Sequence, residues 1–400
     1  MHKSTFSITG DASPIFSEIL PVGQLYFPTR KIFREAFDGI FKRKYFANHG
    51  PLVNKLDVEI ADYLGVRHAI CVTNGTIAIM MACKALGLTG SVIVPSFTFP
   101  ATVQALVWAG LEPIFCDIDT ETHCISYQQA ALLVRNDTSA VLGVHVWGRP
   151  CDTDMLDKLG SKAGIKIFYD ACHAFGVSHK HEHIGNFGEL EIFSFHATKI
   201  LGSAEGGCLT TNNDELAAIL RTMRSFHSDY TETFSPMRIN GKMSEAQAAL
   251  ALISLNQFEA HVNNNKKQWQ RYVQYLDDLP GLKIAKFNEK EAQNYQYFVC
   301  EINASEFGIN RDQLLRVLQA ENIQARRYFY PAVHMLEPFV NHSHNLTLPE
   351  TDRLCQEVIQ LPLGGRCNLK AVEKVAKTIR RARLYSGKLK QFFHRNEIVS

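Results

Sequence analysis

The chain has 400 residues, 46% of them hydrophobic and 20% charged, which suffices for a large buried core shared by one big domain and a smaller one. Its 42 Lys and Arg residues balance 40 Asp and Glu residues, and a formal net charge of +2 argues against binding to nucleic acid or an anionic membrane. The ten cysteines show no Cys-x-x-Cys spacing, and no apolar run resembles a signal peptide or reaches the roughly 20 residues of a membrane span. We therefore expect a cytoplasmic protein with reduced cysteines.

Between residues 65 and 212, short apolar runs alternate with helical patterns, which is typical of parallel strands joined by crossover helices. The runs are, in chain order, "HAICVT", "SVIVPS", "EPIFCDI", "SAVLGVHV", "IKIFYDA", "LEIFSFH" and "GGCLTT". The sequence therefore predicts an α/β domain with a mostly parallel sheet.

The first of these strands leads directly into a helix, "NGTIAIMMACKALGL", which we expect to begin near Gly75 and to stop at Gly87. A helix that starts on Asn-Gly-Thr presents free backbone N–H groups and the positive end of its dipole to an anion. Gly75 would allow close approach of a ligand, and Thr76 would add a hydroxyl group. The purely structural alternative is that Asn74 caps the helix.

Beyond residue 215 the pattern changes to longer helices, including a stretch from 244 to 279 that is long enough for one helix linking two domains. Further on, "NYQYFVCEI" and "IQARRYF" resemble strands, and "RDQLLRVLQAE" and "LKAVEKVAKTIRRARLY" resemble helices. We predict a large domain with an N-terminal arm over residues 1–250 and a small α+β domain over residues 251–400. The basic tail "KLKQFFHRNEIVS" is interpreted as a solvated end.

Two residues at strand ends carry the chemical argument. "IKIFYDACHAFG" brings Asp170 to the carboxyl end of a strand, where ligands of open parallel sheets bind, although a lone aspartate there is also a common turn residue. Lys199 follows the next strand, and a desolvated lysine with a lowered pKa is the group that forms Schiff bases. An anion site, a carboxylate for a pyridinium nitrogen and a Schiff-base lysine are together what pyridoxal 5′-phosphate requires.

Three nearby residues could support such a cofactor, each with an alternative. Phe99 could stack on the cofactor ring or belong to the core. His173 could hydrogen-bond the cofactor's phenolic oxygen or cap a turn. The hydroxyl of Ser194 could reach the phosphate.

These residues and their order resemble the DegT/DnrJ/EryC1/StrS family of sugar aminotransferases. The resemblance rests on the segments "CVTNGT", "VIVPSFTFPAT", "GVHVWGRPCD", "YDACHAFG", "FSFHATKILGSAEGG", "INGKMSEAQAAL" and "ARRYFYPAVH". It implies the fold type I, aspartate aminotransferase-like architecture of PLP-dependent transferases, with a mostly parallel seven-stranded sheet in the large domain and a smaller α+β C-terminal domain.

By this resemblance, Lys199 would bind the cofactor aldehyde, Asp170 would partner the pyridine nitrogen, and His173 and Phe99 would lie beside the ring. Phosphate binding would fall to Gly75, Thr76, Ser194 and, from a second subunit, Asn240. The resemblance thus implies a homodimer with the active site at the subunit interface. The candidates for substrate contact are Phe329, Tyr330 and His334, for which packing of the small domain is the alternative.

The segment "HATK" retains the lysine that a deoxygenating branch of the family replaces with histidine, so the resemblance implies transamination. The expected donor is L-glutamate, and the expected acceptor is dTDP-4-keto-6-deoxy-D-glucose, which would give dTDP-4-amino-4,6-dideoxy-D-glucose for a surface glycan or a secondary metabolite. The alternatives are a 3-keto-sugar aminotransferase, a PLP-dependent sugar dehydratase and a non-catalytic PLP-binding regulator. We expect no metal at "SHKHEHIG", which is a variable turn in this family.

Overall fold

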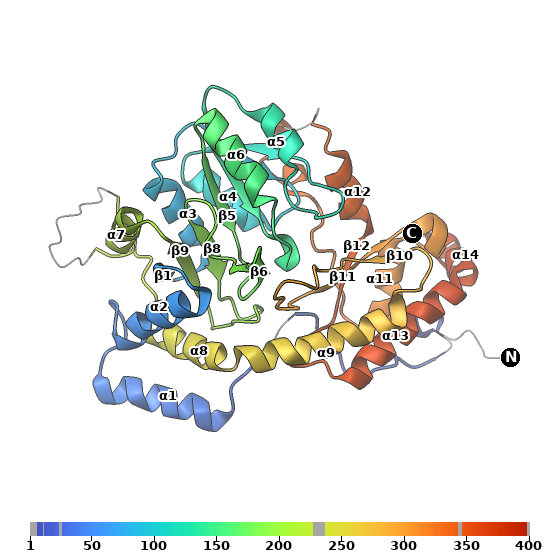
Figure 1. Cartoon of the computed structure of the whole chain (residues 1–400). Helices are drawn as coiled ribbons and strands as arrows, with labels where there is room; N and C mark the ends of the chain where they lie inside the picture. Colours follow the sequence, from blue (N-terminus) through green and yellow to red (C-terminus); the bar gives the residue numbers. More distant parts are fainter. Residues whose placement is uncertain (1–5, 11, 24–25, 227–236, 343–345, 398–400) are drawn as a thin grey trace.

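The computed structural model describes residues 6–10, 12–23, 26–226, 237–342 and 346–397 (Figure 1). Its larger part is built on a seven-stranded sheet with the order β1-β9-β8-β5-β4-β2-β3. The strands are β1 (His68–Val72), β2 (Ser91–Pro95), β3 (Glu112–Cys116), β4 (Thr138–Val144), β5 (Lys166–Asp170), β8 (Glu191–Ser194) and β9 (Gly207–Thr211). Strand β9 is antiparallel to both neighbours, and the other adjacent pairs are parallel. The seven apolar runs are these strands, so the predicted sheet is confirmed.

Helices cover both faces of this sheet because alternate side chains of a buried strand point in opposite directions. On one face Ile70, Val94 and Leu142 pack against α3, α4 and α7. On the other face α2 and α8 lie near β1, β8 and β9, α5 lies near β3, and α6 lies near β4 and β5. The helices of this part are α1 (Arg30–Arg43), α2 (Pro51–Leu64), α3 (Gly75–Ala85), α4 (Pro100–Trp108), α5 (Tyr127–Leu133), α6 (Thr153–Ala163), α7 (Asp214–Met223) and α8 (Glu245–Asn256).

The smaller part is a three-stranded antiparallel sheet with the order β10-β11-β12 and helices packed around it (Figure 1). Its elements are α9 (Phe258–Leu276), β10 (Leu282–Ile284), β11 (Phe298–Ile302), α10 (Ala304–Phe307), α11 (Arg311–Ala320), α12 (Pro349–Glu357), β12 (Val358–Leu361), α13 (Leu369–Leu384) and α14 (Ser386–Glu397). The predicted division at residue 250 falls inside α8 and stays a prediction.

An N-terminal arm, residues 6–10 and 12–23, packs on this smaller part rather than on the sheet that follows it in sequence. Phe6 and Leu20 are buried in the small-domain core. The carboxylate of Glu321 accepts hydrogen bonds from the backbone N–H groups of Ser7 (3.1 Å) and Ile15 (2.8 Å). Leu20 also exchanges backbone hydrogen bonds with the chain on either side of Ile323.

Three expectations about this part were wrong. The tail is not a solvated end, because α14 buries Leu389 and Phe393 in the small-domain core. These two residues are four positions apart and therefore lie on one face of the helix. The stretch 244–279 is two helices, because the backbone at Gln257 (φ −104°, ψ 2°) interrupts it between α8 and α9. The segment "IQARRYF" forms isolated bridges in place of the predicted strand. Ile323 pairs with Leu20 of the arm, and Arg326 pairs with Gln360 of β12.

The segment "SHKHEHIG" forms a short hairpin of β6 (Ser178–His179) and β7 (Glu182–His183). Within the described ranges, no group of three or more His, Cys, Asp or Glu side chains is placed to hold a metal ion.

Candidate active site

A cavity of about 510 Å³ lies at the carboxyl ends of the parallel strands and is lined by the segments that follow β1, β2, β5 and β8. Ligands of open α/β sheets bind at this edge, because the loops and helix starts there are free of the sheet's own packing. The cavity brings together eight of the predicted site residues, namely Gly75, Thr76, Phe99, Asp170, His173, Ser194, Lys199 and Phe329.

The start of α3 forms one end of this cavity. The side chain of Asn74 caps the helix by accepting a hydrogen bond from the N–H of Ile77 (2.9 Å), as the structural alternative proposed. The amides of Gly75 and Thr76, the two residues before Ile77 in the same first turn, have no acceptor within the helix by its geometry. A Cβ at residue 75 would lie 3.2 Å from the Cβ of Ser194. Because Gly75 has no side chain, room remains beside the hydroxyl group of Ser194. Capping by Asn74 is therefore compatible with an anion site at the start of α3.

Asp170 is buried at the end of β5, with an exposed fraction of 6%. The hydroxyl of Thr102 donates to its Oδ2 (2.8 Å), and the backbone N–H of Cys172 donates to its Oδ1 (3.0 Å). The Thr102 hydroxyl also lies 3.0 Å from that of Thr98. Two donors fix the orientation of the carboxyl group, so it can face a protonated ring nitrogen.

His173 lies deeper in the cavity and uses both ring nitrogens. Its Nδ1 accepts the backbone N–H of Trp147 (3.1 Å), and its Nε2 lies 3.2 Å from the hydroxyl of Tyr328. Burial lowers the pKa of His173 well below its ordinary value, and the charge of Lys199 lowers it further. The ring is therefore neutral, with its proton on Nε2 because Nδ1 acts as an acceptor.

Lys199 projects into the same cavity from the turn that follows β8, where its own N–H bonds the carbonyl oxygen of His196 (2.8 Å). Its Nζ donates a hydrogen bond to the hydroxyl of Tyr297 (3.3 Å). Burial raises the pKa of Tyr297, so that hydroxyl is neutral at pH 7. The lysine is half-buried, and its amine meets a polar hydroxyl group and a cavity large enough for a cofactor.

Two aromatic rings form a wall of the cavity. Phe99, which directly precedes Pro100 in the first turn of α4, leaves 52% of its surface exposed. Its ring lies 6.4 Å from that of the buried Phe329. An exposed ring on a cavity wall is available for stacking, which the alternative of a core residue does not explain.

Three predicted residues lie outside the lining of this cavity. The side-chain oxygen of Asn240 accepts a hydrogen bond from Lys242 (2.6 Å). Tyr330 packs beneath the guanidinium groups of Arg311 and Arg327. His334 is buried, with its Nδ1 2.7 Å from the hydroxyl of Ser96.

Four polar residues that sequence reasoning missed also belong to the site: Thr102, Tyr297, Arg326 and Tyr328. Arg326 and Tyr328 lie inside the segment "ARRYFYPAVH", in which only Phe329, Tyr330 and His334 were predicted to contact the substrate. Thr102 follows Pro100 at the start of a helix, a position at which a hydroxyl is common and carries no signal of its own. Tyr297 precedes a small-domain strand, and only the packing of the two parts brings it to Lys199.

Comparison with known proteins decides the class of this site. The model of the DegT/DnrJ/EryC1/StrS aminotransferase family matches residues 29–380. The chain belongs to this family. It is 32% identical over 92% of its length to the dTDP-4-amino-4,6-dideoxy-D-glucose transaminase of Shigella dysenteriae, and it covers 98% of that protein. The enzyme of the same name from Escherichia coli is 31% identical over 90% of this chain and 98% of its own length.

Solved structures agree with this assignment. The DesI structure, determined in the presence of its TDP-sugar product, has a TM-score of 0.93 and 37% identity over 98% of this chain and 99% of that one. DesV from S. venezuelae, in complex with a ketimine intermediate, has a TM-score of 0.85 and 25% identity over 92% of this chain and 99% of its own. The chain is therefore an aminotransferase with the predicted fold.

The cofactor of this family of aminotransferases is pyridoxal 5′-phosphate, and the cavity fits it. A phosphate needs donors, which the free amides at the start of α3 supply next to the hydroxyls of Thr76 and Ser194. A pyridinium nitrogen needs a buried carboxyl group, which Asp170 supplies. An aldehyde needs an amine, which Lys199 brings to the same space.

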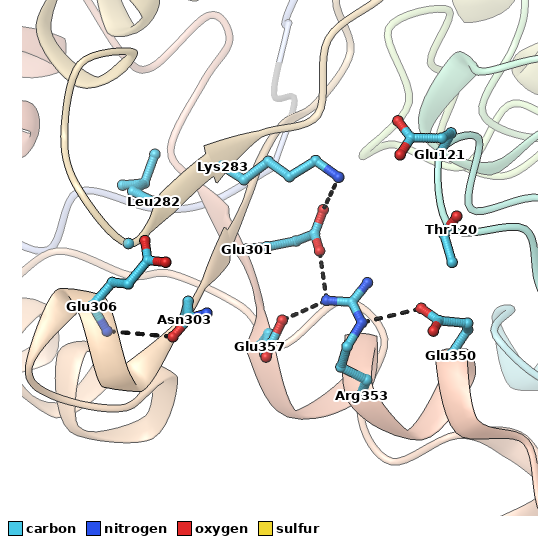
Figure 2. Close-up of a pocket in the computed structure, with 11 residues that line it drawn as sticks. Thr120, Glu121, Leu282, Lys283, Glu301, Asn303, Glu306, Glu350, Arg353 and Glu357 are labelled. Atoms are coloured by element: carbon cyan, nitrogen blue, oxygen red, sulfur yellow. Dashed lines mark hydrogen bonds and ion pairs between the residues drawn. The ribbon is translucent and has the colours of Figure 1, made fainter.

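A second cavity, of about 450 Å³, lies between the loop at Glu121 and the small-domain elements β10, β11 and α12 (Figure 2). The guanidinium of Arg353 donates there to Glu301 (2.8 Å), Glu350 (3.1 Å) and Glu357 (2.5 Å). Five of its eleven lining residues are glutamates, and Arg353 and Lys283 are its cations, whereas Lys199 and Asp170 line the first cavity. No helix within the described residues is long and apolar enough to cross a membrane.

Proposed function

We propose that this aminotransferase moves the amino group of L-glutamate to C4 of dTDP-4-keto-6-deoxy-D-glucose and forms dTDP-4-amino-4,6-dideoxy-D-glucose. The observation that carries the proposal is the amine of Lys199, held in a cavity with Asp170 and the free start of α3. Support for the substrate comes from the names of the relatives from Shigella dysenteriae and Escherichia coli and from the DesI structure with its TDP-sugar product.

In this proposal the residues of the cavity divide the work of holding the cofactor. Gly75, Thr76 and Ser194 bind its phosphate, Asp170 pairs with its ring nitrogen, and Lys199 binds its aldehyde. Phe99 stacks on one face of the ring. When bound, the cofactor supplies a sink for the electrons of the bond that breaks at the donor's α-carbon.

The protein's own groups then move the protons. With the cofactor bound, the amine of Lys199 would act as the base that takes the proton from the donor's α-carbon, and in the second half-reaction it would act as the acid that delivers a proton to the acceptor's carbon. The hydroxyl of Tyr297, 3.3 Å from Lys199 Nζ, holds that amine in place between the two transfers. The neutral ring of His173 donates from Nε2 toward the side of the cavity where Tyr328 lies.

For the sugar, Phe329 in the cavity wall is the substrate contact that the geometry supports best. Tyr330 and His334 remain predicted contacts, although in the described chain they pack against arginines and Ser96. The amino sugar would serve a surface glycan or a secondary metabolite, made in the cytoplasm.

We also propose that the enzyme is a homodimer in which Asn240 completes the partner's phosphate site. Asn240 is exposed and lies outside the cavity of its own chain. An apolar hollow of about 470 Å³, lined in part by Phe27, Phe33, Leu250 and Ile253, borders the Lys199 turn at Ala197 and Gly202. Phe27 leaves 77% of its surface exposed, which favours a covering partner.

Subunit mixing tests this dimer. Lys199→Ala and Asn240→Ala are each expected to be inactive, but a refolded equal mixture should recover about a quarter of wild-type activity. Half of the dimers would be mixed, and each would hold one intact site by the two-fold symmetry. A mixture that stays inactive while light scattering shows dimers would place Asn240 outside the partner's site.

The reaction itself is tested by its two halves. Visible absorbance of the cofactor-loaded protein should bleach with L-glutamate and return with dTDP-4-keto-6-deoxy-D-glucose, and product NMR should show an amine at C4. An amine at C3 would instead support the 3-keto-sugar alternative. A band that glutamate cannot bleach would contradict the proposed donor.

A further inference from the structure

Arg326 stands at the rim of the active-site cavity, and its backbone is held on both sides. Its N–H donates to the carbonyl oxygen of Gln360 (3.0 Å), and the N–H of Gln360 donates to its own carbonyl oxygen (2.8 Å). The N-terminal arm passes beside the guanidinium. A Cβ at Gly23 would lie 3.8 Å from Arg326 Nη1 and 3.9 Å from the methyl group of Thr198. The side chain is therefore directed along the Lys199 turn.

The charge of this guanidinium has no partner among the described residues, where no hydrogen bond or ion pair uses it. The next residue, Arg327, differs: it pairs with Asp312 (3.1 Å). The carboxylates that line the cavity are Asp170, which accepts from Thr102 and Cys172, and Glu205, which faces His196 (3.7 Å). A planar fork of donors without an internal anion suits a carboxylate from outside.

The guanidinium lines the same cavity as the reacting amine of Lys199, and its charge reaches two tyrosines there. Burial raises the pKa of both Tyr297 and Tyr328, and the positive charge of Arg326 opposes that rise in each. The Tyr297 hydroxyl is the one that meets Lys199 Nζ at 3.3 Å. Arg326 thus acts on the part of the cavity where an amine is exchanged.

We propose that Arg326 binds the α-carboxylate of the amino donor. This inference rests on the proposed transamination, in which donor and sugar use the same cavity in turn. The donor carries a carboxylate on the carbon whose amine is exchanged beside Lys199. The keto sugar has no anion next to its carbonyl carbon, because its charges sit on the diphosphate. Arg326 therefore recognises the donor and takes little part in binding the acceptor.

The test compares the two half-reactions in the cofactor-loaded enzyme by stopped-flow absorbance. In Arg326→Gln, the glutamate concentration for half-maximal bleaching should rise at least about tenfold, which corresponds to about 1.4 kcal/mol. The keto-sugar concentration for half-maximal return of the band should stay within about twofold of the wild-type value, since small packing changes alone can cause a difference of that size. For Arg326→Lys, the glutamate concentration for half-maximal bleaching should lie between those of wild type and Arg326→Gln, because lysine keeps the charge but lacks the paired planar donors of the guanidinium.

A binding measurement gives a second readout that needs no turnover. Titration calorimetry with glutarate, a dicarboxylate without an amine, should show a Kd weakened at least about tenfold in Arg326→Gln. Arg135→Gln is the matched control, because Arg135 is an exposed arginine that pairs with Glu112 (3.5 Å), outside the lining of this cavity. It should behave like wild type in every assay.

Three results would overturn the inference: an unchanged Arg326→Gln, an equal loss in both half-reactions, or a loss confined to the sugar, which would assign Arg326 to the diphosphate. Failure of the proposed function looks different. Wild type would then not bleach with glutamate, while the Kd of glutarate would still report whether Arg326 binds a carboxylate.

Discussion

The ion pairs around Glu301 predict a large and pH-dependent contribution to stability. Glu301 on β11 leaves only 6% of its side chain exposed and contacts Arg353 of α12 at 2.8 Å (Figure 2). It also lies 3.3 Å from His123 of the large domain. Burial alone would raise the pKa of Glu301, but His123 and Arg353 lower it from 4.5 to about 2. That displacement corresponds to about 3 kcal/mol of stability.

The sign follows from the direction of the shift. A carboxyl whose pKa is depressed in the folded state stabilises the fold fully above its unfolded value of 4.5 and loses that effect as the pH falls toward 2. Glu301→Gln should therefore lower the free energy of unfolding by about 3 kcal/mol at pH 7. The gap between variant and wild type should narrow below pH 4.5.

Urea denaturation followed by circular dichroism measures this, with Glu350→Gln as the control. Glu350 contacts the same Arg353 (3.1 Å) but leaves 32% of its side chain exposed, so its removal should cost less than about 1 kcal/mol. If the two variants were equally stable at pH 7, or if the gap did not change with pH, the argument from the buried carboxylate would be refuted.

Three further predictions concern the site and the C-terminal helix. Lys199→Ala should abolish both turnover and the visible band while leaving the circular dichroism spectrum unchanged; wild-type turnover would refute its role. Thr102→Val, which removes a hydrogen bond to the Asp170 carboxylate, should lower kcat at least about tenfold, and Thr102→Ser should restore it; a variant with unchanged kcat would show that the bond is dispensable. Phe393→Ala should destabilise the protein by about 3–5 kcal/mol in urea, whereas the half-buried Phe392→Ala should cost clearly less; equal losses would contradict the packing of α14.

The sequence was informative where a local pattern determines the structure. Seven apolar runs became seven strands, and Asp170 and Lys199 could be named as candidates for one site because strand ends in a parallel sheet meet at one edge. Residues that depend on long-range packing left no such signal. Tyr297, which meets Lys199, and Arg326, which lines the cavity, come from the small domain, and nothing in their neighbours along the chain marks either as a site residue. Phe393 was misjudged because a basic segment can still be one face of a buried helix.

The position of the N-terminal arm has a consequence for the order in which the protein is made. Ser7 bonds to a glutamate 314 residues further along the chain, and the core that receives Phe6 also contains Phe393. Synthesis at about 5–20 residues per second means that the arm waits roughly 15–60 s before Glu321 exists. During that time the large sheet, complete by residue 211, can already form. The arm, although it is made before the large sheet, is thus among the last segments to reach its native place.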